Sequence, residues 1–379
     1  MRLPALSLLS AFALTTATTT ATASTVIVPD HAVNAPSNAQ FISNHTAFDG
    51  PKVFPINAST WDWWYFDAVQ VSPDTNSTDQ ASVVATFYTA LPSAFEPLAL
   101  YAARGFTSLS LGEIVVTWPN GTRNVFLFNS TEARITTVGD GAVGVWESPE
   151  GDASFRGSED MRIYEVTLES EIVSGRIVLQ AIAPPHYPCG PAEAAQGMQL
   201  APGIGWANAV PDAISDVHLT VYGQNLDFTG IGYHDKNWGN VNFAQHVGTW
   251  YWGHGRVGPY SLVWFDYVSP KPEQNNRVAV YVSRGGEILT SQCSGVTVRP
   301  FGDNSTYPPL MSTGAPTGFN ISVEIPGADD MEFAAMAKYV VAGSSMVGYV
   351  RWTGSLEVEV DGERMVGETL YEQFAFERE

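Results

Sequence analysis

The side chains best suited to chemistry lie in one stretch, Thr249 to Arg256, which reads TWYWGHGR. Side chains of a β-strand alternate between its two faces. On an extended backbone, one surface of this stretch therefore carries Trp250, Trp252, His254 and Arg256. Two indoles, an imidazole and a guanidinium on one surface favour a binding pocket with apolar walls and a few polar groups.

A second motif, HDKNWG at residues 234–239, is suited to proton transfer. Histidine titrates near neutral pH and a neighbouring carboxylate tunes it, so His234 or Asp235 is a candidate acid or base. His246 is a further candidate because it lies close to the same stretch. Alternatively, the motif is a structural turn in which the Asp and Asn side chains bond to backbone amides and the tryptophan fills the core.

Two cations lie in otherwise apolar segments, Lys338 in AAMAKYVVAG and Arg351 in MVGYVRWTG. Such cations either extend to solvent or point into a cavity, where they hold an anionic or carbonyl-bearing ligand. Large aromatic side chains pose the same choice between core packing and pocket lining. We take both cations as candidate site residues, and Trp63, Tyr65 and Trp352 as candidate pocket residues.

Several classes of function are disfavoured by what the sequence lacks. It has no HExxH, His-x-His or clustered cysteine pattern, so we expect no metal. It has no Gly-x-Ser-x-Gly elbow, phosphate loop or dinucleotide fingerprint, so hydrolases, kinases and nicotinamide enzymes of ordinary type are disfavoured. The formal net charge of −21 argues against nucleic acid and anionic membrane surfaces as partners.

The N-terminus predicts entry into the secretory pathway. Residues 1–23 hold Arg2, an apolar run and a small-residue end, as in a cleaved signal peptide. The apolar run is too short to span a bilayer. In an oxidising compartment Cys189 and Cys293 form one disulfide, unless they remain two buried thiols. Seven predicted glycosylation sites begin at Asn44, Asn57, Asn76, Asn120, Asn129, Asn304 and Asn320.

The elements that must position these residues are strands. Alternating segments recur about every 10 to 14 residues with turn signals between them, which is typical of a sandwich or barrel. Thr60 to Val69, TWDWWYFDAV, is the first strong strand, and its two apolar faces predict burial on both sides. Residues 184–211 are rich in Pro, Gly and Ala, which predicts a long loop or connector with one helix-like piece at 192–200. The chain is predicted to be all-β.

Three pieces together resemble the fungal Diels-Alderase family: TWDWWYFD at 60–67, GYHDKNWGN at 232–240 and WYWGHGRVGPYSLVWFD at 250–266. That family is similar to the hydroxyneurosporene-synthase-like and AttH-like proteins, which have two lipocalin-like halves. The resemblance implies an N-terminal β-sandwich packed against a C-terminal lipocalin-like β-barrel, with a cofactor-free pocket between them. We divide the chain into a signal peptide at 1–23, a sandwich domain at 24–222 and a barrel domain at 223–379.

The activity implied by the resemblance is a [4+2] cycloaddition in fungal secondary metabolism. The secretory signal and the many glycosylation sites look more like the branch that joins a tropolone quinone methide to a sesquiterpene by a hetero-Diels-Alder reaction. The partner would be a small hydrophobic polyene, terpenoid or tropolone. Aromatic side chains would shape the pocket, cations and His254 would polarise a carbonyl or tropolone oxygen, and His234 or His246 would move a proton.

Two other functions remain open from the sequence. The wider family favours a hydratase, dehydratase or isomerase acting on a terpenoid or carotenoid. Two lipocalin-like halves also suit a non-catalytic carrier of hydrophobic metabolites.

Overall fold

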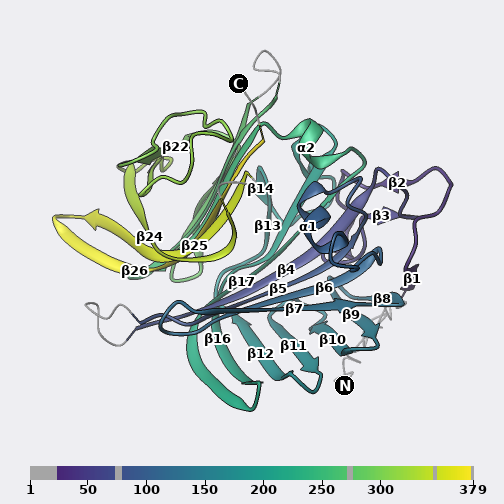
Figure 1. Ribbon diagram of the computed structural model, residues 1–379. Coiled ribbons are helices and arrows are strands. Elements are labelled where there is room, and N and C mark those ends of the chain that lie inside the picture. The colour runs from purple at the N-terminus through teal and green to yellow at the C-terminus, as the bar shows by residue number, and fades with distance from the viewer. Residues whose placement is uncertain (1–23, 73–78, 271–275, 345–347, 377–379) are drawn as a thin grey trace, which may run out of the picture.

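The computed structural model describes residues 24–72, 79–270, 276–344 and 348–376, and this part of the chain is nearly all β (Figure 1). The all-β prediction is confirmed. Within these ranges no helix is both long and apolar enough to cross a bilayer. The expected signal peptide and the glycosylation site at Asn76 lie outside the described residues.

The first sheet is antiparallel and curls on itself (Figure 1). Its strands within residues 61–129 pack over its strands within residues 132–181, and the two layers form a sandwich. Its order is β1 (Ser24–Pro29), β8 (Glu132–Val138), β9 (Gly141–Ser148), β10 (Gly151–Gly157), β11 (Ile163–Glu169), β12 (Val173–Ala181), β16 (Ile204–Val221), β17 (Gln224–Gly239), β4 (Trp61–Gln70), β5 (Ser82–Ala90), β6 (Ser110–Thr117) and β7 (Arg123–Asn129). Short strands beside it are β13 (His186–Tyr187), β14 (Gly190–Pro191) and β15 (Gln199–Ala201), while β2 (Asn38–Ala39) pairs separately with β3 (Val53–Phe54).

The second sheet curls around a core of its own as a half-barrel (Figure 1). Its order is β21 (Glu287–Gln292), β20 (Arg277–Arg284), β19 (Tyr260–Val268), β18 (Thr249–Val257), β26 (Glu363–Ala375), β25 (Tyr349–Val360), β24 (Met331–Ser344), β23 (Gly318–Val323) and β22 (Val296–Phe301). In the described ranges, helical structure is limited to short pieces: η1 (Glu96–Leu98), α1 (Ala99–Ala102) and α2 (Phe243–His246).

The change from one sheet to the other lies later in the chain than the expected boundary after residue 222. Strand β17 pairs along its whole length with β16 or β4, so it belongs to the first sheet. The first sheet therefore continues to Gly239, and the second begins at Thr249. The HDKNWG motif is the end of this long central strand rather than a turn.

Burial on both faces of β4 has a simple cause: the strand lies between two hydrophobic cores. Trp64 and Phe66 face the core inside the first sheet. Trp61, Trp63 and Tyr65 face a second core, which is shared with the other sheet. The alternation predicted for Thr60 to Val69 is thus confirmed, because each face of the strand has its own packing partner.

The segment 184–211 is less irregular than its composition predicts. Strand β16 already begins at Ile204 and runs through Pro211, and the expected helical piece at 192–200 holds turns and β15 instead. Register shifts in the pairing of β16 with β17 lie at residues 208–213. Such irregularities let a strand accommodate proline, which explains why Pro211 does not end β16.

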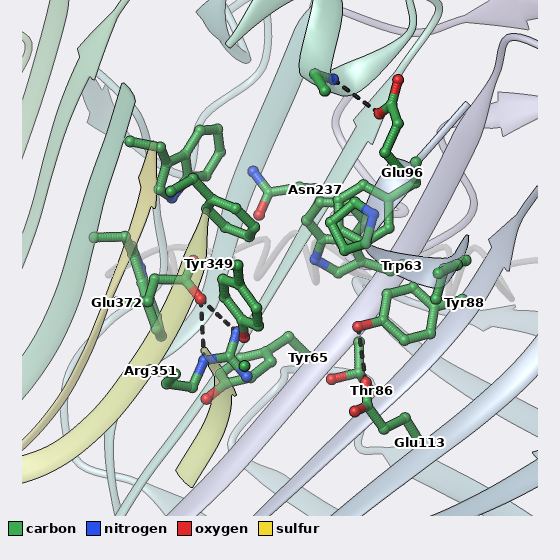
Figure 2. A pocket seen from close by; sticks show the side chains of 18 of the residues that line it. Trp63, Tyr65, Thr86, Tyr88, Glu96, Glu113, Asn237, Tyr349, Arg351 and Glu372 are labelled. Carbon is green, nitrogen blue, oxygen red and sulfur yellow. Dashed lines mark hydrogen bonds and ion pairs between the residues drawn. The ribbon is translucent and has the colours of Figure 1, made fainter. Parts of the chain in front are cut away.

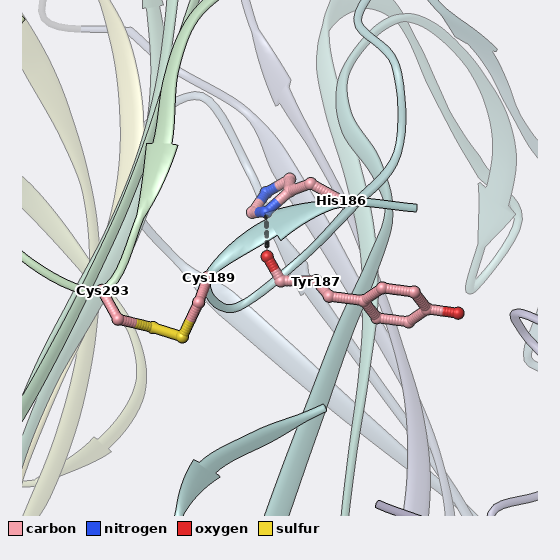
Figure 3. Close-up of a disulfide and its surroundings, with 4 residues drawn as sticks. All are labelled: His186, Tyr187, Cys189 and Cys293. Atoms are coloured by element: carbon pink, nitrogen blue, oxygen red, sulfur yellow. Dashed lines mark hydrogen bonds between the residues drawn. A yellow bond between two sulfur atoms is a disulfide. The ribbon is translucent and has the colours of Figure 1, made fainter. Parts of the chain in front are cut away.

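Cys189 and Cys293 form a disulfide, with their Cα atoms 4.7 Å apart (Figure 3). Cys189 lies between β13 and β14, and Cys293 follows β21 in the second sheet. The predicted disulfide is therefore confirmed, and it links the two halves of the chain. His186 adds to this junction because its ring stacks on Tyr281 of β20 at 4.3 Å.

We expect removal of the disulfide by the double substitution Cys189→Ala and Cys293→Ala to lower the free energy of unfolding by about 2 to 4 kcal/mol. The bond closes a long loop, because the cysteines are 104 positions apart in the sequence, and so restricts the unfolded chain. Denaturant unfolding of the variant, and of the natural chain with and without reductant, measures the effect. Equal stability in all three samples would contradict the prediction.

Candidate active site

A cavity of about 410 Å³ lies between the two sheets. Its apolar walls come from both halves of the chain, and they include Trp63, Tyr65, Tyr88, Phe95, Trp250, Trp252, Phe265 and Phe374. The cavity expected beside the indoles at 250 and 252 is therefore present. It has the size and the largely aromatic lining that suit a drug-sized organic molecule.

Strand alternation aims the indoles at this cavity. Trp63 and Tyr65 project from β4, and Trp250 and Trp252 project from β18 of the facing sheet. Tyr65 meets Trp252 edge to face, with ring centroids 5.4 Å apart. Trp63, Tyr65 and Trp252, which the sequence predicted as pocket residues, thus line one cavity.

Glu113 of β6 is a buried carboxyl group in the cavity wall, 9% exposed. The Tyr88 hydroxyl donates to Glu113 Oε2 at 3.2 Å (Figure 2). The Tyr101 hydroxyl of α1 donates to Glu113 Oε1. Burial raises the pKa of Glu113, although these hydroxyls and the charge of Arg351 act in the opposite direction. A raised carboxyl pKa favours the protonated form, which is the form that acts as an acid.

Arg351 of β25 reaches the same cavity, as predicted for this cation (Figure 2). Its Nη2 donates to Glu372 Oε2 at 2.6 Å and its Nε to the same oxygen at 3.0 Å. Its guanidinium carbon lies 4.5 Å from the Tyr65 ring centroid. The guanidinium is held between a carboxylate and an aromatic face, so its position is fixed.

Asp235 and Asn237 of β17 also line the cavity. Asp235 Oδ2 accepts from the Tyr233 hydroxyl at 2.7 Å and from Trp206 Nε1 at 2.8 Å. Burial raises the pKa of Asp235 to about 7. Asp235 is therefore a cavity residue, and the bonds that its side chain makes are to other side chains rather than to backbone amides.

His254 lies behind the cavity wall rather than in it. It is 1% exposed, its Nε2 lies 2.8 Å from Asp67 Oδ2, and its ring stacks on Tyr233 at 4.3 Å. The Tyr65 hydroxyl donates to the same oxygen of Asp67 at 2.8 Å. His254 therefore reaches the cavity through Asp67 and Tyr65, which corrects the expectation of direct contact with a ligand.

Lys338 and Trp352 do not line the cavity. Lys338 is half-buried on β24, where a register shift between residues 337 and 339 interrupts the regular alternation. Trp352 follows Arg351 on β25, so it points to the opposite face and packs 5.3 Å from the Tyr371 ring in the core of the second sheet. The predicted contact of these two residues with a ligand is corrected accordingly.

His234 and His246 also lie outside the cavity lining. His234 is fully buried on the other face of β17, where it stacks on Phe66 at 3.9 Å and its Nε2 lies 3.1 Å from Asp49 Oδ2. His246 lies on α2, and its Nδ1 is 2.9 Å from the Asn242 carbonyl oxygen. The motif thus presents Asp235, and not His234, to the cavity.

One end of the cavity is covered by η1 and α1, close to α2 (Figure 1). The Glu96 carboxylate accepts from the Ala244 backbone N–H at 3.0 Å and joins these pieces (Figure 2).

Among the described residues, no group of three or more His, Cys, Asp or Glu side chains is arranged to hold a metal ion.

A model of Diels-Alderase-like proteins matches residues 23–299. The chain belongs to the Diels-Alderase-like family. The resemblance seen in the three sequence pieces is thereby confirmed. A protein of known structure, CghA with Sch210972, superimposes with a TM-score of 0.73 at 15% identity, covering 93% of this chain and 98% of that one. This likeness shows a shared fold.

Two relatives in this family are similar over almost their whole length. The quinolone epoxide rearrangement protein penF of Penicillium thymicola is 34% identical over 361 residues, covering 93% of this chain and 95% of the relative. The quinolone epoxide rearrangement protein asqO of Emericella nidulans is 31% identical over 361 residues, covering 93% of each. Both relatives are named for reactions, and the homologues of this chain are enzymes.

Sequence reasoning missed Glu113, although the signal was present. Glu113 is a single carboxylate in the apolar strand SLGEIVVT. A charged residue in an otherwise apolar strand is the same pattern that led us to choose Arg351. Glu372 in LYEQFA carries the same signal. Tyr101 has no such signal because it belongs to a short helix whose position over the cavity depends on the whole fold.

Proposed function

We propose that this protein catalyses the acid-assisted rearrangement of an epoxide carried by a flat, aromatic small molecule. The observation that carries the proposal is Glu113, a buried carboxyl group with a raised pKa in the wall of an aromatic cavity. In the first step, Glu113 donates its proton to the epoxide oxygen. The carbon–oxygen bond then breaks, its electron pair stays on oxygen as a hydroxyl group, and the carbon that held it becomes cationic. A group on the hydroxyl-bearing carbon migrates with its bonding electrons to the cationic carbon, and the hydroxyl-bearing carbon becomes a carbonyl. The hydroxyl proton returns to the Glu113 carboxylate, so the product is an isomer of the epoxide.

The aromatic walls suit such a cation. Faces of tryptophan and tyrosine stabilise positive charge, most strongly where water is excluded. Trp63, Trp250 and Trp252 are each less than 10% exposed and lie around the space where the cation would form. The walls also exclude water, which would otherwise add to the cation and give a diol.

The names of the relatives support the substrate class. Two proteins at 34% and 31% identity, aligned over more than nine tenths of both chains, are named for quinolone epoxide rearrangement. A quinolone is flat, aromatic and polar at its carbonyl group. In our proposal Arg351 donates a hydrogen bond to that carbonyl oxygen, as predicted for this residue from the sequence.

We expect the double substitution Arg351→Met and Glu372→Gln to raise KM about tenfold, because one charge-assisted hydrogen bond to the substrate is lost. The pair is changed together so that no buried carboxylate is left without its partner. Steady-state kinetics measure the effect, and Glu372→Gln alone is the control. An unchanged KM in the double variant would remove Arg351 from substrate binding.

The direct test is turnover of synthetic quinolone epoxides that open to resonance-stabilised cations. We expect the purified protein to convert one of them to a rearranged isomer of unchanged mass, faster than buffer alone. Liquid chromatography with mass spectrometry separates this isomer from the diol, which is heavier by one water. A product mixture and rate identical to those in buffer would refute the proposal.

A second candidate is the [4+2] cycloaddition, including the hetero-Diels-Alder reaction of a tropolone quinone methide with a sesquiterpene. The family match favours it, and an aromatic cavity between the two sheets suits a reaction that depends on holding two partners in near-attack geometry. The two candidates differ in their need for an acid. Adduct formation that is insensitive to Glu113→Gln would support cycloaddition and argue against acid-assisted ring opening.

We also propose that the chain is secreted or enters the secretory lumen. The disulfide supports this, as do the six sequon asparagines among the described residues, none of which is buried. Expression in a fungal host, followed by removal of N-linked glycans, should shift the electrophoretic mobility of the protein. A protein without glycan that remains in the cytosol would contradict the proposal.

A further inference from the structure

Four cavity residues lie directly opposite one another on four neighbouring strands. Asp235 of β17 pairs with Tyr65 of β4, Tyr65 pairs with Thr86 of β5, and Thr86 pairs with Glu113 of β6. All four line the cavity. Residues in register on one face of a sheet form a row, so this row crosses the cavity wall with a carboxyl group at each end.

The length of the row separates the two carboxyl groups. Three strand spacings lie between β17 and β6, which places the Cα atoms of Asp235 and Glu113 roughly 14 Å apart. The two carboxyl groups therefore act on different ends of a ligand. A bicyclic aromatic ring system with a side chain is long enough to span most of this row.

The Asp235 carboxylate is held with one oxygen left for a ligand. In the described part of the chain, both hydrogen bonds that its side chain accepts fall on Oδ2, from Trp206 and Tyr233. Trp206 packs edge to face on Phe265 at 4.7 Å, and Tyr233 stacks on His254. These buried rings fix the carboxylate, and Oδ1 is the oxygen that remains for the cavity.

We propose that Asp235 anchors the substrate by accepting a hydrogen bond from a ring N–H or O–H group at the end opposite the reacting oxygen. This inference rests on the proposed function, because Glu113 defines the reacting end. It assigns the substrate to a class: a flat apolar molecule with a hydrogen-bond donor at one end and an ionisable carbon–oxygen bond at the other. A quinolone with a free ring N–H and an epoxide on its side chain belongs to this class.

The test uses an unreactive probe, so that binding is measured apart from turnover. The probe is the quinolone alkene that lacks the epoxide oxygen, prepared with a free ring N–H and as the N-methyl derivative. Quenching of tryptophan fluorescence reports its binding, because indoles line the cavity. The measurement is made at about pH 8.5, where a carboxyl group with the raised Asp235 pKa of about 7 is ionised. We expect the natural chain to bind the N–H probe about 10- to 100-fold more tightly, the value of a hydrogen bond to a charged group.

The substitution Asp235→Asn separates hydrogen bonding from steric fit. Trp206 and Tyr233 both donate, so they hold the amide oxygen of the new side chain and turn its NH₂ group toward the cavity. We expect the preference for the N–H probe to fall to within about threefold. Asp266→Asn is the matched control, because Asp266 is also buried and accepts from a tyrosine, Tyr307, but lies outside the cavity lining.

Two results would overturn the inference: equal affinity of the natural chain for both probes, or a full preference retained in Asp235→Asn. Melting temperatures of both variants check the fold, and the comparison of probes on the natural chain needs no variant. If the natural chain prefers the N–H probe but does not convert the epoxide, the anchor stands and the proposed reaction fails.

Discussion

Replacement of Glu113 by Gln is expected to reduce turnover of a quinolone epoxide by about 10²- to 10⁴-fold, the usual contribution of a positioned general acid. Gln has the shape of Glu and keeps an oxygen for one tyrosine, Tyr88 or Tyr101, but it has no proton to give. KM should change little, since the substrate is held by the aromatic walls, Arg351 and Asp235. Steady-state kinetics on the purified variant measure both constants.

The matched control for this variant is Glu368→Gln. Glu368 is half-buried and burial raises its pKa as it does for Glu113, but it contacts Gln80 and the Ser72 backbone outside the cavity lining. It should retain full turnover. If Glu113→Gln keeps more than a tenth of the natural rate while folding normally, Glu113 is not the acid.

The pH dependence follows from the same carboxyl group. Glu113 acts in its protonated form, so the rate should be highest at low pH and fall as pH rises through its raised pKa. Because burial raises that pKa above the ordinary value for Glu, the fall should lie at higher pH than for an exposed carboxyl group. The residual rate of Glu113→Gln should lack this fall.

The largest expected effect on stability comes from Lys236→Met. Lys236 is fully buried beside the first core, with its Nζ 2.8 Å from Asp62 Oδ1 and 4.0 Å from the Trp64 ring centroid. Loss of the cation leaves a buried carboxylate without its counter-charge, so the free energy of unfolding should fall by about 3 to 5 kcal/mol. Denaturant unfolding followed by tryptophan fluorescence measures this change.

The double variant Asp62→Asn with Lys236→Met separates the two contributions. It removes both charges of the pair and should recover most of the stability lost in the single variant, because the Asp62 carboxylate no longer stays buried without Lys236. Lys236 faces away from the cavity, so the double variant should also retain turnover. A loss below about 1 kcal/mol in Lys236→Met would show that the pair matters little to folding.

Alternation along single strands accounts for what the sequence predicted well. It placed Trp63 with Tyr65 and Trp250 with Trp252, and both pairs line the cavity. Local periodicity is enough here because each strand is extended and buried on both faces. Arg351 and Trp352 are neighbours on one strand, so alternation places their side chains on opposite faces. The prediction that both residues line the pocket was therefore inconsistent with the alternation rule.

Sheet order is what the sequence did not provide. The row from Asp235 to Glu113 requires β17 to pair with β4, which lies more than 150 residues earlier in the chain. No local pattern specifies such a partner. The prediction that His254 contacts a ligand was wrong for a related reason. The strand that carries His254 was predicted correctly, but Asp67 and Tyr65 lie between His254 and the cavity, and their position depends on how the two sheets pack together.

A crystal structure of the protein with the rearranged product bound is the most direct test of the proposed acid and anchor. We expect the product in the cavity between Trp63 and Trp252. Its oxygen derived from the epoxide should lie about 2.6 to 3.2 Å from a Glu113 oxygen, and its ring N–H should point at Asp235. A product bound elsewhere, or bound with that oxygen far from Glu113, would contradict the proposed mechanism.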